Sequence, residues 1–224
     1  MDFSLAFSFP FKDPDWVKKI LIVGLITLIP IIGEIFLLGW AVEITRRVIQ
    51  NEPTLLPDID FGNHLSKGFQ VFIIELVFAI PLFIFTLPPN LIPFIVQNMQ
   101  NSNTAGTVTA IIGLCCGGLS FLYGIFLAFV LPAAVGNFAA KGSIGAGFAF
   151  SEIFALIRTA PVAYLIVLLA GFVAGIISSL GLIACVIGVL FTAAYASAVM
   201  GHFYGQAYRE GVSNPIQMQA PMTY

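Results

Sequence analysis

Positive charge is missing from the middle of this chain. The nine Lys and Arg residues among 224 include none between Gly68 and Ala140. Loops rich in Lys and Arg stay on the cytoplasmic side of a membrane, so a loop without them is typical of the opposite side. Charged residues make up only 9% of the chain, and the formal net charge is -2. This composition argues against a nucleic-acid partner, and no basic run offers a polyphosphate patch.

Cysteines and processing signals are also scarce. Cys115, Cys116 and Cys185 all lie inside apolar segments, and neither their number nor their spacing fits a disulfide or zinc framework. We interpret them as small apolar side chains. The first residues read Met-Asp-Phe-Ser, with no short apolar core before a small-residue cleavage site. We therefore expect no cleaved signal peptide.

Familiar catalytic motifs are absent. No His-Glu-x-x-His, Gly-x-Ser-x-Gly or phosphate-loop pattern occurs, which removes the usual support for hydrolase and nucleotide chemistry. His64 lies near Asp58 and Asp60, but this spacing matches no strong metal-binding pattern, and a solvated loop explains it. We expect a protein that is not an enzyme and has no catalytic residue, cofactor or metal ion.

Long apolar tracts dominate what is present. Five of them are nearly free of charge: Ile20–Ile44, Val71–Leu87, Val108–Val135, Val162–Ile177 and Leu182–Val199. Phe121–Leu131 is continuously apolar, whereas the strands of a membrane barrel alternate apolar and polar residues. The sequence predicts an all-α, polytopic transmembrane bundle of about five to six membrane helices. One membrane domain would cover residues 1–210, followed by a short, loosely ordered tail at 211–224.

The first tract is interrupted. Asp13 and Pro14 favour a helix start, with Asp13 as the cap. Only ten apolar residues, Ile20–Ile29, then precede Pro30. At 1.5 Å per residue they span about 15 Å, roughly half the hydrocarbon core. The tract is therefore either a proline-kinked span or a re-entrant hairpin that turns near Pro30–Glu34.

Basic residues on each side separate these two topologies. A single span would leave the three lysines before the tract outside and the other six basic residues inside. A re-entrant hairpin would keep all nine in the cytoplasm, which the positive-inside rule favours. The kinked helix stays open, because Ile20–Ile44 spans about 37 Å, enough to cross once with tilt.

The second tract predicts a helix over residues 66–87. Pro88, Pro89 and Pro93 follow it and favour an end to the helix. We therefore predict an outer loop over residues 88–107, followed by a long third helix that ends near Phe138.

The second half of the chain predicts an interfacial helix and two membrane helices. Within residues 143–159, polar and small side chains on one helical face oppose aromatic and aliphatic ones on another, as in a helix that lies in the membrane interface. Pro161 would start the fourth helix, a tight turn would follow at Ser178–Gly181, and a fifth helix would return.

A few polar residues lie within or beside the membrane tracts. An ionisable group inside a membrane segment is costly, so Glu75 is a candidate polar site, with His202, Asn137 or a freed backbone group near Pro30 as its partner. Glu34 would lie at the turn of the first tract. Each of these has a structural alternative, such as a protonated carboxyl shared between helices.

Glycine spacing indicates close helix packing. Three pairs four residues apart place small residues on one helix face: Gly113 with Gly117, Gly171 with Gly175, and Gly201 with Gly205. Such faces let two backbones approach closely, within one bundle or between subunits.

Several segments resemble a known family. They are Phe9–Ile20, Leu28–Gly33, Leu38–Trp40, Arg46–Val48, Asp60–Gly62 and, more weakly, Phe148–Tyr164. In these the chain resembles the prokaryotic membrane-protein family called domain of unknown function 4013. The resemblance implies a small polytopic bundle in a bacterial or archaeal membrane, and it brings no activity and no catalytic residues.

We expect a non-enzymatic, multi-pass protein of the prokaryotic plasma membrane. The basic loops and both termini would be cytoplasmic, and the loop at 88–107 would lie outside. Its partners would be membrane lipids, other membrane subunits or further copies of itself, and it would act as an accessory or scaffold subunit. The alternative is a transporter or channel for a small solute or lipid that uses the broken first helix and Glu75.

Overall fold

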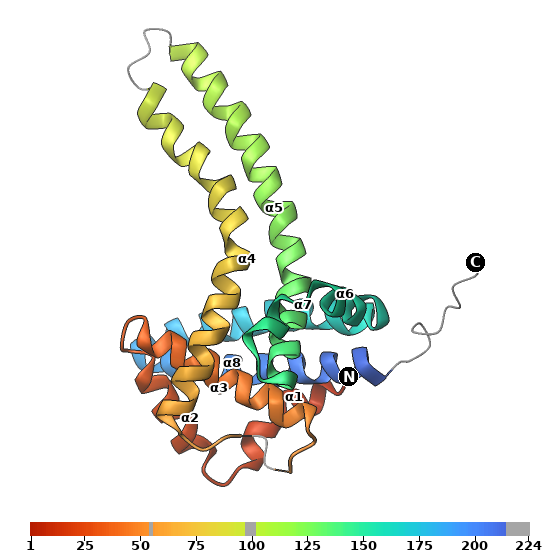
Figure 1. Cartoon of the computed structure of the whole chain (residues 1–224). Coiled ribbons are helices and arrows are strands. Elements are labelled where there is room, and N and C mark those ends of the chain that lie inside the picture. Colours follow the sequence, from red (N-terminus) through yellow and green to blue (C-terminus); the bar gives the residue numbers. More distant parts are fainter. Residues whose placement is uncertain (54–55, 97–101, 214–224) are drawn as a thin grey trace, which may run out of the picture. The chain divides into compact units, whose positions relative to one another are not determined.

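The computed structural model describes residues 1–53, 56–96 and 102–213. This part of the chain forms helices and no strands, which confirms the all-α prediction. The elements, shown in Figure 1, are α1 (Phe3–Ser8), η1 (Phe9–Lys12), α2 (Trp16–Ile26), α3 (Ile32–Ile49), α4 (Phe61–Val96), α5 (Ser102–Lys141), η2 (Ile144–Phe148), α6 (Phe150–Thr159), α7 (Pro161–Leu180), η3 (Gly181–Ala184) and α8 (Cys185–Ser213), where η marks a 3-10 helix. Two compact units result: unit 1 is Met1–Ile74 with Phe129–Tyr224, and unit 2 is Glu75–Ala128.

Three helical stretches are long and apolar enough to cross a membrane. They are Phe61–Ile92, Gly106–Lys141 and Pro161–Ile183. These stretches contain the second, third and fourth predicted tracts. In the described part of the chain, three of the five predicted tracts therefore have the dimensions of a span.

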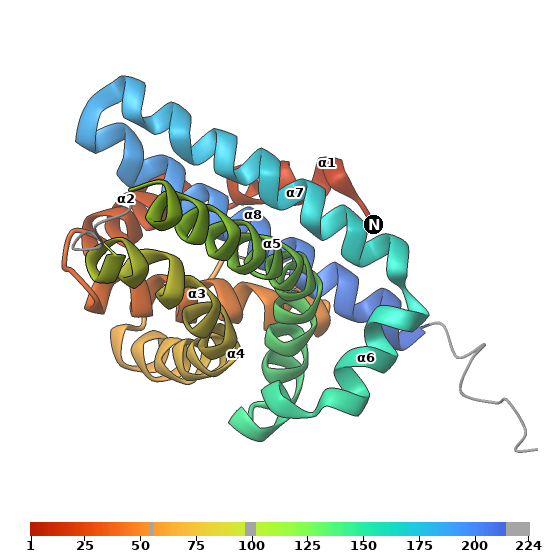
Figure 2. The ribbon, with the colours of Figure 1, turned by 90° about the horizontal axis from the view of Figure 1, so that it is seen from above.

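Helix α8 lies at the centre of unit 1. It packs against α3 and α7 and also contacts α2, α6 and α1, and Figure 2 shows α7 and α3 on either side of it. The core that it shares with α2 and α3 contains Phe36, Trp40 and Ile44, which are fully buried beside Ala194 and Ala198. Small side chains on α8 leave room for these large ones, so several helices can pack closely around α8.

Glycines bring α3 into backbone contact with two neighbours. A methyl group on Gly201 of α8 would lie 2.5 Å from the Ala41 carbonyl oxygen. On another side of α3, a methyl group on Gly39 would lie 1.7 Å from the His64 carbonyl oxygen, and one on Gly68 would lie 1.7 Å from that of Ile35. Helix α3 is therefore held in register with α8 and with the start of α4 by positions that accept no side chain.

The first tract is divided between two helices. Helix α2 ends at Ile26 and α3 begins at Ile32, and Ile31 between them has a φ of 68°. This left-handed conformation is rare for a β-branched residue. A methyl group on Gly33 would lie 2.3 Å from the Ile26 carbonyl oxygen, so the two helix ends meet closely. The helical structure of the first tract is therefore interrupted between Ile26 and Ile32, around Pro30.

The start of α2 differs from the prediction by two residues. The Asp13 carboxylate accepts a hydrogen bond from the Asp15 N–H at 2.8 Å, and the Trp16 N–H donates to the Asp13 carbonyl. Asp13 therefore stabilises a turn before the helix rather than its first turn, and the helix begins at Trp16.

Unit 2 consists of parts of two helices, and the predicted outer loop at 88–107 is wrong over most of its length. Helix α4 continues through Pro88 and Pro89 to Val96, and α5 starts at Ser102; residues 97–101 lie outside the described residues. Thr86 and Asn90, on either side of the prolines, each donate a side-chain hydrogen bond to a carbonyl in the preceding turn. These bonds end at Phe83 and Thr86, and not at the carbonyls of Ile84 and Phe85 that the prolines leave without an N–H partner. Apolar helices nevertheless tolerate proline.

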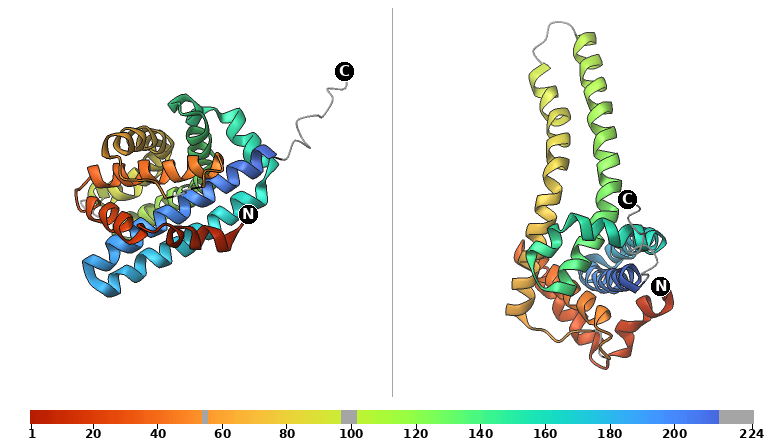
Figure 3. Two further views of the ribbon diagram at one scale, coloured as in Figure 1. Left: turned by 90° about the horizontal axis from the view of Figure 1, so that it is seen from below. Right: turned by 45° about the vertical axis from the view of Figure 1, so that its right-hand side comes forward.

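The two helices of unit 2 lie side by side (Figures 1 and 3). The Tyr123 hydroxyl of α5 donates to the Phe78 carbonyl of α4 at 2.8 Å, and its ring contacts Phe85 edge to face. Most of the large apolar side chains here are exposed, among them Phe83, Ile84, Leu114 and Phe121. Unit 2 is a helical hairpin with little core of its own.

The second half of unit 1 largely follows the prediction. Helix α5 ends at Gly142, whose φ of 68° and N–H bond to the Phe138 carbonyl are typical of a helix C-terminus. Helix α6 buries Ile153 and Leu156 and exposes Phe150 and Phe154. Helix α7 begins at Pro161 as predicted. The turn before α8 is η3 at Gly181–Ala184, slightly later than predicted.

Replacing Gly39 with Ala is expected to destabilise the protein strongly. The new methyl group would overlap a helix backbone, which cannot move aside like a flexible side chain. Overpacking costs typically about 1–3 kcal/mol, which corresponds to a Tm lower by roughly 2–10 °C. Thermal unfolding of the purified protein in detergent measures this.

Gly118→Ala is the matched control, because no atom lies within 4 Å of a methyl group at this position in α5. It is expected to leave Tm unchanged or slightly raised, since Ala favours helix. Equal Tm values for Gly39→Ala and wild type would show that α3 and α4 do not approach this closely.

Candidate functional site

A buried carboxylate lies at the C-terminal end of α3. Glu43 is only 5% exposed. It accepts hydrogen bonds from Arg46 at 2.6 Å and from Lys67 of α4 at 2.6 Å, and Arg47 contacts it at 3.4 Å. Both arginines also pair with Glu52 in the loop after α3. This ionic cluster joins α3, the loop and the start of α4.

The cluster keeps Glu43 ionised. Burial alone would raise the pKa of this carboxyl group, but the hydrogen bonds and charges of Arg46 and Lys67 outweigh burial and lower the pKa to about 2. Arg46 and Arg47 lie three and four residues after Glu43 on the same helix, whereas Lys67 comes from α4. A carboxylate surrounded by three cations in this way is a structural anchor.

A second group of ion pairs holds the start of α2. Lys19 pairs with Asp13 at 2.8 Å and with Asp58 at 2.9 Å, and it donates to the Leu56 carbonyl. Asp58 belongs to the same loop as Glu52, which binds the arginines of α3. The basic residues at both ends of the first tract are therefore held by one loop.

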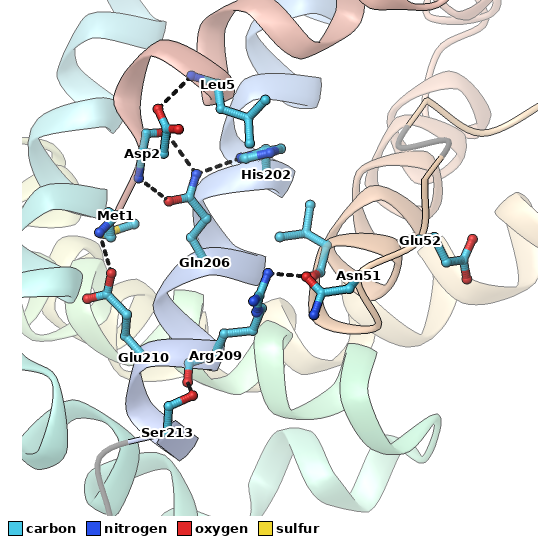
Figure 4. A pocket seen from close by; sticks show the side chains of 11 residues that line it. Met1, Asp2, Leu5, Asn51, Glu52, His202, Gln206, Arg209, Glu210 and Ser213 are labelled. Carbon is cyan, nitrogen blue, oxygen red and sulfur yellow. Dashed lines mark hydrogen bonds and ion pairs between the residues drawn. The ribbon is translucent and has the colours of Figure 1, made fainter.

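A polar cleft of about 530 Å³ opens beside this loop, between the first residues of the chain, the end of α3 and the last turns of α8. Figure 4 shows its side chains. The lining residues are Met1, Asp2, Leu5, Val48, Asn51, Glu52, His202, Gln206, Arg209, Glu210 and Ser213.

A chain of hydrogen bonds crosses the cleft wall. Gln206 accepts from the Asp2 N–H at 2.6 Å, and its amide nitrogen contacts the Asp2 carbonyl at 3.0 Å and His202 Nδ1 at 2.9 Å. The His202 ring also stacks on Phe9. Figure 4 shows Gln206 between Asp2 and His202. These contacts fasten the segment that leads into α1 onto α8.

His202 is neutral at physiological pH. The residue is 1% exposed, and burial lowers its pKa to about 4; Asp2 opposes this shift, while Arg209 and Lys12 reinforce it. Neutral imidazole accepts a hydrogen bond from the Gln206 amide in the arrangement described. Among the residues predicted as a polar site, His202 is the one that lines a cavity.

Asn137 lies in a separate polar group within unit 1. Its amide donates to the Ala146 carbonyl at 2.9 Å and to Glu152 at 2.7 Å, and Glu152 also pairs with Lys141. Hydrogen bonds from Lys141 and Asn137 lower the pKa of Glu152. Asn137 thus connects the end of α5 to η2 and α6.

The two other predicted residues stand apart from these clusters. Glu75, the first residue of unit 2, is half-buried on α4, and Glu34 is exposed in the first turn of α3. No described contact gives Glu75 a partner. The two side-chain partners suggested for it, His202 and Asn137, both bond to groups of unit 1.

The predicted glycine faces have different surroundings. Gly201 and Gly205 lie against α3, and a methyl group on Gly205 would be 2.6 Å from Val48. Gly171 faces Met200 with ordinary spacing. Positions 113, 117 and 175 face open space among the described residues. The closest contacts, at Gly39 and Gly68, carry no paired spacing in the sequence and were missed.

Most of the cleft was also missed. Asp2, Asn51 and Arg209 come from segments far apart in the chain, and no local spacing connects them. A weak signal existed in the polar residues that end α8, such as Gln206, Arg209 and Glu210.

The fold and the charged clusters define the class of this molecule: an all-α protein with three helices of membrane-spanning dimensions. The family model described as "Protein of unknown function (DUF4013)" matches residues 22–187. The chain belongs to this family, as its first seventy residues indicated. No curated protein and no solved structure matches it.

Replacing Glu43 with Gln is expected to remove the pH-dependent contribution that this carboxylate makes to the stability of the fold. The folded pKa of about 2 lies below the ordinary 4.5, so ionised Glu43 stabilises the fold above pH 4.5, and this stability is lost as pH falls toward 2. The shift corresponds to about 3 kcal/mol as an order of magnitude. Tm measured at pH 7, 5 and 3 tests this.

The Glu43→Gln substitution should lower Tm at pH 7 and flatten its decline on acidification. Glu34→Gln is the control, because Glu34 is exposed and its replacement removes the same charge from the same helix. Wild type and Glu43→Gln with parallel Tm profiles would refute the anchoring role.

Proposed function

We propose that this chain is a non-enzymatic, multi-spanning protein of the prokaryotic plasma membrane that works by packing, as an accessory or scaffold subunit of a larger membrane assembly. The main observation behind this proposal is that most of the large apolar side chains of unit 2 are exposed. Its two helices bury few of their side chains, and only Glu75 among its residues is charged. Glu75–Val96 spans about 33 Å and Ser102–Ala128 about 40 Å, so both match a bilayer.

One face of α5 favours a protein partner over lipid alone. Gly106, Ala110, Gly113, Gly117, Ser120 and Gly124 follow one another at intervals of three or four residues. No described atom lies within 4 Å of a methyl group placed on any of these glycines. Lipid chains gain little from such a face, whereas a second helix packs closely against small residues. Another membrane subunit or a second copy of this chain fits it.

The charged clusters support a hairpin for the first tract. Lys19, before it, and Arg46 and Arg47, near its end, are both held by residues 52–58 of one loop. A single membrane span would separate these charges by the hydrocarbon core. A re-entrant hairpin keeps them, the N-terminus and the C-terminus on the cytoplasmic side, with the α4–α5 connection outside.

The alternative is a transporter or channel for a small solute or lipid. It is favoured by the chain reversal at Ile31 and by Glu75, an ionisable group in a membrane-length helix. The paired state of the other charged clusters favours the packing role instead, since a carrier needs polar groups that are free to bind.

Association through α5 is the central prediction. The tagged protein, extracted from its native membrane in mild detergent, is expected to migrate with a stoichiometric partner or as a homo-oligomer. Changing both Gly113 and Gly117 to Leu should disrupt this complex, because two large side chains would fill the small-residue face. Size-exclusion chromatography and mass spectrometry of the purified sample measure it.

Gly118→Leu is the matched control, since Gly118 is equally open but about 100° around the helix. It should leave the complex intact. A wild-type protein that migrates as a lone protomer would count against the packing role and favour the transporter, with Glu75→Gln and solute uptake as the next measurement.

Topology gives a second test. Cysteine introduced at Ser4 is expected to resist a membrane-impermeant thiol reagent added to intact cells and to react after permeabilisation. Cysteine at Ser102 is the control and should react in intact cells, because α5 begins next to the predicted outer connection. Reaction of the Ser4 position in intact cells would rule out the re-entrant hairpin.

A further inference from the structure

A smaller cavity along the N-terminal segment borders the polar cleft beside α8. This second cavity, of about 230 Å³, is lined by residues that include Lys12 and Asp13, and it shares Leu5 and Glu52 with the cleft. Lys12 and Arg209 both act on the pKa of His202, so both lie within electrostatic range of the same ring. The two cavities adjoin at Leu5 and Glu52, and together they form the surface considered below, with Arg209 lining one cavity and Lys12 the other.

The acidic residues of this surface already have partners. Glu52 pairs with Arg46 and Arg47, Asp13 pairs with Lys19, and Glu210 pairs with the Met1 amino group. The Asp2 carboxylate accepts the Leu5 N–H at 2.8 Å and caps α1. Three of these four acidic residues therefore have a cationic partner, although Asp13 shares Lys19 with Asp58, and Asp2 has a backbone N–H partner.

The two side-chain cations are not compensated. Within the described part of the chain, Lys12 has no ion pair, and Arg209 makes one long hydrogen bond, to the Val48 carbonyl at 3.5 Å. Figure 4 shows Arg209 extending toward Asn51, whose amide likewise has no described partner. A guanidinium group offers five N–H donors, so most of those on Arg209 remain available.

We propose that this surface binds a phosphate group through Arg209 and Lys12. Arginine and lysine together provide the charge and the N–H donors that phosphate oxygens accept. His202, which is neutral, adds no charge and leaves the two cations as the determinants. The phosphate belongs either to the head group of an anionic phospholipid or to a small soluble phosphate compound.

The test uses the purified full-length protein in detergent and three probes: phosphatidylglycerol, phosphatidylcholine and inorganic phosphate. The rise in Tm with probe concentration gives an apparent Kd, since a ligand that binds the folded state stabilises it. Binding of phosphatidylglycerol in preference to phosphatidylcholine identifies a lipid head group. A rise in Tm with inorganic phosphate alone identifies a soluble source.

Lys12→Gln and Arg209→Gln are each expected to weaken binding by about tenfold or more, because each removes a charge-assisted hydrogen bond. Lys18→Gln and Arg158→Gln are the matched controls: both residues carry the same charge and line neither cavity. They should leave the apparent Kd within about twofold, a difference that corresponds to less than about 1 kcal/mol.

Two results would overturn the proposal. One is the absence of any Tm response to both phosphate-bearing anionic probes, and the other is an equal loss of affinity in the control variants, which would indicate diffuse charge attraction. Should Arg209→Gln fail to fold, Arg209→Lys and Lys12→Gln carry the test, since the first keeps the charge and the second removes no described contact.

Discussion

Close backbone contact along α3 is the constraint on which the rest of unit 1 depends. Gly39 admits the backbone of α4, and Gly201 of α8 admits the backbone of α3. In an apolar solvent there is little hydrophobic force between helices, so close packing has to supply the attraction. Each glycine therefore stabilises the packing because it has no side chain: a single methyl group would push the two helices apart.

The charged residues follow from this register. Once α3 is fixed against both neighbours, its last turns and Lys67 at the start of α4 meet at Glu43. A buried carboxylate is costly unless it is paired, and here three cations surround it. The loop at 52–58 then joins α3 to α2 through Glu52 and Asp58. Packing thus places the charges, and the charges in turn hold the reversal of the first tract.

Much of the fold follows from local sequence, and the errors have physical causes. The all-α character and three helices of membrane-spanning length were predicted from the apolar tracts, and helical structure is interrupted around Pro30, between Ile26 and Ile32. The predicted helix end at Pro88 was wrong because proline is tolerated inside apolar helices of membrane-spanning length, and α4 continues through Pro88 and Pro89 to Val96. The cleft at Arg209 was missed because its side chains come from three distant segments.

The difference between the two units bears on what the protein does. Unit 1 has a core of large side chains around α8, and its described charges are mostly paired. Unit 2 has almost no core, although only one of its residues is charged, and Tyr123 makes a hydrogen bond between its two helices. A hairpin of this kind gains stability from the surrounding membrane and from whatever helix packs on its small-residue face. One chain therefore combines a unit that has a core of its own with a unit that has almost none, and the proposed accessory role would use the uncovered helices of the second unit.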